Sequence, residues 1–171
     1  LMLMTARRAG EGERLVRKGK WEGWHPTQML GYHVSGKTAA IIGMGRIGQA
    51  IAHRCHFGFG MDIIYNSRSS KNLDFPATYF QNIEEATKKA DIVFIAVPGG
   101  IATRHLINRR IFCTMKSHSI LVNISRGDVI AEIDLIEALK NGDIGGAGLD
   151  VYEFEPKIPA ELLEMDNVTL F

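Results

Sequence analysis

The stretch TAAIIGMGRIGQAIA, residues 38–52, decides the fold of this chain. Its first six residues form a short apolar run that predicts a buried strand. Residues 46–58 repeat apolar side chains at helical spacing and end in glycines that suit a C-terminal cap. A strand that turns through glycines into a helix is the first half of a βαβ unit. The stretch therefore predicts an α/β fold.

Three glycines inside this stretch, Gly43, Gly45 and Gly48, have the G-x-G-x-x-G spacing. A chain with 18 glycines produces that spacing easily, so the pattern counts only because it leaves a strand and opens a helix. There the first glycine permits a tight turn, the second lets a pyrophosphate approach the backbone, and the third lets the helix pack on its strand. The N–H groups that open the helix, at Arg46 and Ile47, then face the phosphates. The alternative is a glycine-rich turn that binds no ligand.

The remainder of the chain alternates short apolar runs with helical segments. This alternation is typical of a parallel sheet with crossover helices. Roughly seven strands in two βαβαβ halves make a doubly wound sheet of the Rossmann type. Further strands are predicted at residues 61–66, 91–98, 119–124, 145–151 and 167–171. Further helices are predicted at residues 83–90, 102–115 and 134–142.

Composition argues against several classes of function. Hydrophobic residues make up 46% of the chain, charged residues 23%, and the net charge is +1. This balance favours neither nucleic acid nor an anionic membrane as partner, and no apolar run approaches the roughly 20 residues that span a bilayer. Cys55 and Cys113 have neither CxxC nor metal-ligand spacing, and no histidine pair sits with a cysteine or an acid at metal-ligand spacing. We therefore expect no metal site and a cytoplasmic location.

Residues 1–24 precede the alternating pattern and are interpreted as a helical arm. They lead into a dinucleotide-binding domain at residues 25–171, since a chain of 171 residues is enough for one domain with a core. The segment opens inside an apolar stretch, which predicts a helix whose beginning lies before Leu1. Its basic residues are interpreted as a solvated helix face.

The end of the second predicted strand bears on the choice of cofactor. Enzymes that use NAD carry an acid there, about 20 residues after the glycines, for the ribose hydroxyls. This chain reads YNSRSSK at residues 65–71, with Ser67 in the acid's place, followed by Arg68 and Ser69. A carboxylate would repel a 2′-phosphate, whereas a guanidinium hydrogen-bonds it through two parallel bonds. NADP is therefore favoured over NAD. The alternative is that Arg68 is a solvated loop residue.

Four separated motifs occur in the order found in one known family. They are GKTAAIIGMGRIGQAIA (36–52), LVNISRGDVI (121–130), LIEALKNGDIGGAGLDVYEFEP (135–156) and DNVTLF (166–171). Over essentially its whole length the chain resembles the cofactor domain of the D-isomer-specific 2-hydroxyacid dehydrogenases, most closely the glyoxylate and hydroxypyruvate reductase branch. The resemblance implies an oxidoreductase that transfers hydride between a nicotinamide cofactor and a small 2-oxo or 2-hydroxy acid.

The resemblance also implies roles for individual residues. Arg126, in NISRG, matches the arginine that binds the substrate carboxylate and 2-oxo group, for which a bidentate guanidinium is suited. Glu155, in YEFEP, matches the acid that pairs with a proton-transferring histidine. Taken alone, the first is also explained as a turn arginine and the second as a surface carboxylate. Asp150 matches the aspartate that hydrogen-bonds the nicotinamide carboxamide. The remaining residues assigned to the cofactor are Val97, Pro98, Thr103 and Ile124.

The chain departs from the family pattern in three places. PGGIAT (98–103) stands where the family has L-T-P-E-T, which adds flexibility and leaves Thr103 for a phosphate-side contact. The family's catalytic histidine follows the last strand in a P-H motif, whereas this sequence ends at Phe171. Most of the family's substrate domain is also absent. We therefore expect a domain incomplete at both ends, which binds a dinucleotide without reducing a 2-oxo acid by itself.

Two expectations concern partners and rival functions. In the family the helix that enters this domain packs across a two-fold axis, so a homodimer is implied. The apolar residues available for this contact are Leu1, Leu3, Leu15, Val16, Trp21 and Trp24. The alternative is that they pack on their own domain.

A nucleotide-sensing protein of the corepressor type, built on the same fold, is the rival from another class. An adenosylhomocysteine hydrolase is a third interpretation, and NISRG with YEFEP argues against it.

Overall fold

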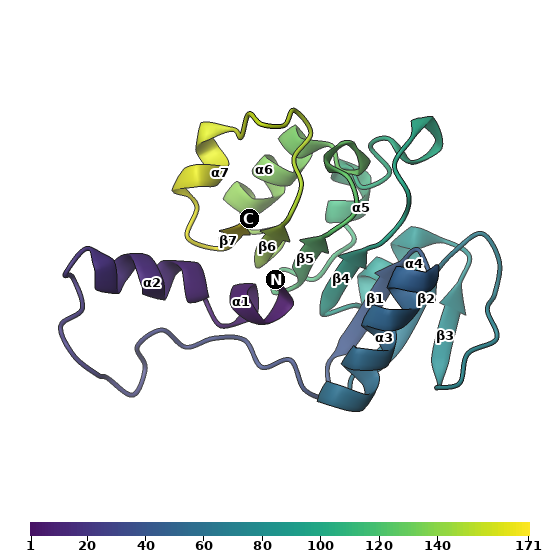
Figure 1. The fold of residues 1–171 in the computed structure, drawn as a ribbon, viewed down its shortest axis with the longest axis horizontal. Helices are drawn as coiled ribbons and strands as arrows, with labels where there is room; N and C mark the ends of the chain where they lie inside the picture. Colours follow the sequence, from purple (N-terminus) through teal and green to yellow (C-terminus); the bar gives the residue numbers. More distant parts are fainter.

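A seven-stranded parallel sheet forms the centre of the computed structural model, which describes residues 1–171 (Figure 1). The strand order is β3-β2-β1-β4-β5-β6-β7. The chain therefore enters in the middle of the sheet, builds outward to one edge, and returns to build the other half, as predicted for a doubly wound sheet. The strands are β1 (Thr38–Ile42), β2 (Asp62–Asn66), β3 (Ala77–Phe80), β4 (Ile92–Ile95), β5 (Ile120–Asn123), β6 (Gly146–Leu149) and β7 (Val168–Leu170).

Helices cover both faces of this sheet. They are α1 (Met2–Ala6), α2 (Ala9–Arg17), α3 (Arg46–Phe59), α4 (Ile83–Lys89), α5 (Arg109–Phe112), α6 (Glu132–Asn141) and α7 (Ala160–Glu164). Successive strand residues point to opposite faces: in β1, Ala39 and Ile41 join the apolar cluster under α1 and α3. Ala40 and Ile42 join the cluster packed against α4 to α7. Burial on both faces explains why the strands are continuous apolar runs rather than alternating ones.

One predicted helix is wrong. Residues 102–115 contain two short helical turns, the 3-10 helix η1 (Ile101–Thr103) and α5, separated by an extended segment. In that segment the fully buried Ile107 forms an isolated parallel bridge with Ile130. Long-range pairing and burial therefore outweigh the helical tendency of the local sequence. The pattern also does not indicate β3, because this edge strand is only half-buried and lacks a continuous apolar run.

The amino-terminal segment consists of two helices rather than the one helix expected. Arg8, with φ 53°, has a left-handed backbone between α1 and α2. Helix α1 packs against β5 and β6 and buries Met2, Thr5 and Ala6. Helix α2 buries no residue completely and contacts the edge strand β7, and the loop that follows it extends away from the sheet (Figure 1).

Every helix falls short of the length and apolar character that a bilayer crossing demands.

Candidate functional site

A cleft opens where the winding of the sheet reverses. Strands β1 and β4 are neighbours in the centre, and the chain connects them to opposite halves of the sheet. Ligands of doubly wound sheets bind at the carboxyl ends of the strands at this point. The cleft has a volume of about 810 Å³. Its walls are Gly45, Arg46, Ile47, Ala96, Val97, Pro98, Gly99, Gly100, Ile124, Ser125, Arg126 and Asp128.

The glycine turn after β1 forms one wall of this cleft. Gly43 has φ 102°, and a Cβ there would lie 2.6 Å from the carbonyl oxygen of Ala96. A Cβ on Gly48 would collide with the carbonyl oxygen of Gly43 and lie 3.0 Å from Ile41 Cγ2. A Cβ on Gly45 would meet no atom within 4 Å. The fold therefore requires glycine at Gly43 and Gly48. At Gly45 the fold does not require it, and the open space beside this residue is available to a ligand.

The start of α3 faces the same wall. Gly45 is the N-cap of this helix, and no side chain caps it. The first N–H groups of a helix have no intrahelical acceptor and carry the positive end of the helix dipole. Arg46 and Ile47 are exposed beside them. This arrangement suits the phosphates of a dinucleotide.

Arg126 also lines the cleft, on a turn that follows β5. The carboxamide of Asn123 accepts a hydrogen bond from the Ser125 N–H (3.0 Å) and donates one to the Arg126 carbonyl (3.0 Å). The exposed guanidinium donates to the Ser125 carbonyl at 2.6 Å. A Cβ on Gly99 would lie 2.7 Å from Arg126 Cγ. Gly99, in PGGIAT, therefore lies directly against the Arg126 side chain.

Asp150 and Glu155 lie outside this cleft. Asp150 is exposed at the end of β6, and its N–H donates to the Asn123 carbonyl (3.1 Å). Glu155 is exposed and accepts from the Tyr152 N–H at 2.9 Å. The loops of Arg126 and Glu155 nevertheless touch, because a Cβ on Gly127 would collide with the Tyr152 carbonyl. The structure brings the two loops together without placing both side chains in one cleft.

The residues predicted to recognise the ribose lie next to the glycine turn. The Gly43 N–H donates to the Asn66 carbonyl (2.9 Å), which holds the end of β2 beside the turn. Ser67 Oγ donates to the Ser69 carbonyl at 2.6 Å, and Arg68 is exposed.

Thr103 lies on the loop that follows β4. Its hydroxyl donates to the Pro98 carbonyl at 2.7 Å. Donation from this hydroxyl to a phosphate therefore requires that bond to break. The cleft is also lined by residues that the sequence analysis did not assign to the site: Ala96, Gly99, Gly100, Ser125 and Asp128.

A doubly wound parallel sheet with this turn, helix terminus and cleft defines a dinucleotide-binding domain. The chain belongs to the D-isomer specific 2-hydroxyacid dehydrogenase family, as its NAD binding domain, because the family model of that domain matches residues 1–171.

Named relatives agree with this assignment. Over 177 residues the chain is 47% identical to a glyoxylate reductase of Thermococcus onnurineus and 48% identical to one of Pyrococcus horikoshii. Each alignment covers 99% of this chain and 52% of the relative. A crystal structure of an NADPH-dependent glyoxylate/hydroxypyruvate reductase from Sinorhizobium meliloti, in complex with NADP and malonate, superposes with a TM-score of 0.91. It is 35% identical, with 99% of this chain and 53% of that chain covered. The chain thus spans about half the length of the curated relatives it matches.

Proposed function

We propose that this chain is the NADP-binding half of a reductase that converts a small 2-oxo acid, such as glyoxylate or hydroxypyruvate, into the 2-hydroxy acid. The observation that carries the proposal is that Arg126 and the glycine turn line the same cleft, on the turns that follow β5 and β1. A guanidinium there holds a carboxylate through two bonds and polarises the neighbouring carbonyl. The names of the relatives as glyoxylate reductases support this substrate class.

Each predicted residue has one task in this proposal. The bound dinucleotide supplies the hydride. The N–H groups at the start of α3 bind its phosphates, and Arg68, with Ser67 and Ser69, binds the 2′-phosphate. Asp150 accepts from the carboxamide, and Glu155 orients a proton-transferring histidine. The residues that pack along the cofactor are Val97, Pro98, Thr103 and Ile124. No observation favours the corepressor alternative.

We further propose that the arm at residues 1–24, which leads into the domain at 25–171, forms a homodimer contact through the part that follows α1, since α1 itself packs on the sheet. Val16, Trp21 and Trp24 are 60%, 56% and 79% exposed, which supports a partner surface over packing on their own domain. Exposed aromatic residues of this kind are enriched in protein interfaces.

Cys55 and Cys113 are both free thiols, which supports a reducing, cytoplasmic location.

The activity is tested with Arg126→Gln in the whole reductase, substrate-binding half included, because we expect residues 1–171 alone to bind the dinucleotide without turnover. Loss of two charge-assisted hydrogen bonds, worth about 1.5–3 kcal/mol each, should lower kcat/KM for glyoxylate by at least about a hundredfold. The Kd for NADPH should stay within about threefold, because phosphates and ribose are bound elsewhere. Arg109→Gln is the matched control, since this exposed arginine pairs with Glu137 (3.3 Å) on the helical surface. A wild-type protein that reduces no 2-oxo acid would overturn the proposal.

The cofactor preference is tested with Arg68→Ala. Wild-type protein should bind NADPH about tenfold to a hundredfold more tightly than NADH, the worth of one charge-assisted contact. The variant should lose that preference, and Arg54→Ala, an exposed arginine on α3, should keep it. Equal affinity of the wild type for the two cofactors in fluorescence titrations would show that Arg68 does not read the 2′-phosphate.

A further inference from the structure

His105 and Glu153 form a hydrogen-bonded pair outside the cleft. His105 Nε2 lies 2.7 Å from Glu153 Oε1, and the carboxylate side chain is only 8% exposed. The second oxygen of Glu153 accepts from the Glu132 N–H (3.4 Å), and Glu132 Oε1 accepts from the Glu153 N–H (3.3 Å). A buried carboxylate is costly without partners. His105 is the shortest of the polar contacts of Glu153, and Arg104 Nη2 lies 4.0 Å from the same oxygen.

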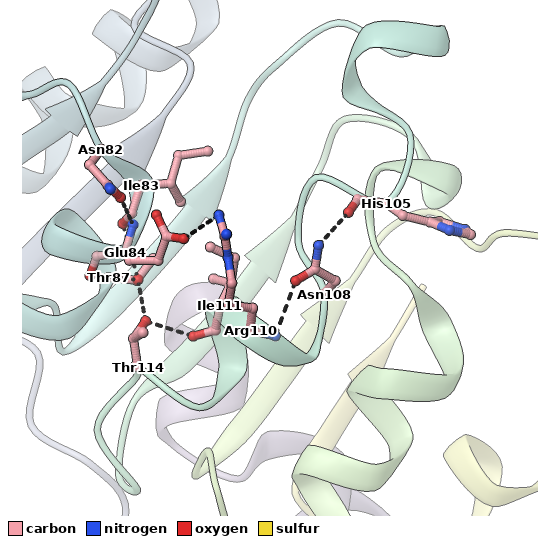
Figure 2. Close-up of polar contacts among 9 residues, drawn as sticks. All are labelled: Asn82, Ile83, Glu84, Thr87, His105, Asn108, Arg110, Ile111 and Thr114. Carbon is pink, nitrogen blue, oxygen red and sulfur yellow. Dashed lines mark hydrogen bonds and ion pairs between the residues drawn. The ribbon is translucent and has the colours of Figure 1, made fainter.

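The backbone of His105 is held in an unusual conformation. Its φ is 49°, a left-handed value that costs energy for any residue with a side chain. The surrounding structure maintains it: the His105 N–H donates to the Asp128 carbonyl (2.8 Å), and the His105 carbonyl accepts from Asn108 Nδ2 (3.0 Å). Figure 2 shows the Asn108 amide at this carbonyl, with the imidazole pointing away from it. The conformation aims the ring at Glu153.

The pair spans the loop that carries Arg126. On one side of that loop, residues 105–107 run along residues 128–131, with Ile107 N–H donating to the Val129 carbonyl (3.0 Å). On the other side, Gly127 lies against the Tyr152 carbonyl without room for a Cβ. The Arg126 loop is thus enclosed between the β4 connection and the Glu155 loop, and the His105–Glu153 bond joins these two outer segments.

We propose that His105 is a positioning residue for Arg126. Through its bond to Glu153 it fixes the enclosed loop, and so sets the placement of the Arg126 guanidinium toward a 2-oxo acid. His105 does not line the cleft and acts only through the loop. The inference rests on the proposed function, in which Arg126 binds the substrate. Misplacement of a binding group by about 1 Å costs up to about a hundredfold.

The test compares substitutions at two similar histidines in the whole reductase, substrate-binding half included. His105→Asn tolerates the left-handed backbone but is too short to reach Glu153, whereas His105→Gln returns an N–H donor near the Nε2 position. His118→Asn is the matched control, because His118 Nε2 bonds the buried Asp91 at 3.0 Å with similar exposure. That pair lies at the opposite end of the strands, where Asp91 precedes β4.

The expected result is a rise in KM rather than a loss of active protein. His105→Asn should raise KM for glyoxylate about tenfold or more, with Kd for NADPH within about threefold, and His105→Gln should recover most of it. A merely structural role would lower apparent kcat through the folded fraction and leave KM unchanged. A KM for His105→Asn within about twofold of an active wild type, no recovery by Gln, or an equal rise in His118→Asn would overturn the inference alone. A wild type inactive with glyoxylate would overturn the proposed function as well.

Discussion

Alanine substitutions at Gly45 and Gly48 should separate what the ligand needs from what the fold needs. The two glycines lie in one turn, three residues apart, and have opposite surroundings. A Cβ on Gly48 meets the Gly43 carbonyl oxygen and the buried Ile41, whereas a Cβ on Gly45 meets open space. We therefore expect Gly48→Ala to lose stability, and Gly45→Ala to lose dinucleotide binding with its stability intact.

The magnitudes follow from these contacts. Overpacking against backbone costs about 3 kcal/mol, which for a domain of this size lowers Tm by about 6–12 °C. At Gly45 the φ of −83° suits any residue. Alanine is a poorer N-cap than glycine but restricts the unfolded chain, so Tm should change by less than about 3 °C. A methyl group that blocks one charge-assisted phosphate contact costs about 1.5–3 kcal/mol, or about tenfold to a hundredfold in Kd.

Thermal unfolding and NADPH titration on the same preparations measure both quantities. Gly58→Ala is a suitable control, because its Cβ also meets no atom within 4 Å but it lies far along α3 from the turn. If Gly45→Ala binds NADPH as tightly as the wild type, phosphates do not approach this turn. If Gly48→Ala melts at the wild-type temperature, the close packing of α3 on β1 is not what that glycine provides.

Two further predictions concern stability in acid and association. Burial alone would raise the pKa of Asp91, but hydrogen bonds from Lys116, the Thr38 N–H and His118 outweigh it and lower the pKa from 3.8 to about 2. Because the folded value is the lower one, this carboxylate contributes about 2 kcal/mol that is complete above about pH 4 and lost as pH falls toward 2. In Asp91→Asn the free energy of unfolding, measured by urea titration, should depend less on pH between about pH 4 and 2. An unchanged dependence on pH would contradict the lowered pKa of Asp91. If the arm forms the dimer contact, sedimentation of the whole reductase at micromolar concentration should give a dimeric mass. Trp24→Glu should reduce that mass to a monomer, whereas Ile133→Glu, on the exposed face of α6, should not. A monomeric wild type would contradict the prediction.

Much of the fold follows from local patterns in the sequence. The run at residues 38–52 predicts a strand, a glycine turn and a helix, and β1 and α3 occupy those places. Strand-forming apolar runs and helical periodicity act over a few residues, so a linear reading detects them. The same reading singles out Gly45 and Arg126, because each follows a predicted strand directly and parallel strands end at one edge of the sheet.

Other features depend on contacts between distant residues and were decided only by the tertiary structure. Residues 102–115 have a helical pattern, yet Ile107 pairs with Ile130 because burial in the core is worth more than a local propensity. Gly99 lies against the Arg126 side chain, which comes from the loop after β5. His105 meets Glu153 across 48 positions of sequence. No local spacing records such a pair, since a side chain's partners are set by how the loops fold onto the sheet and not by its neighbours along the chain.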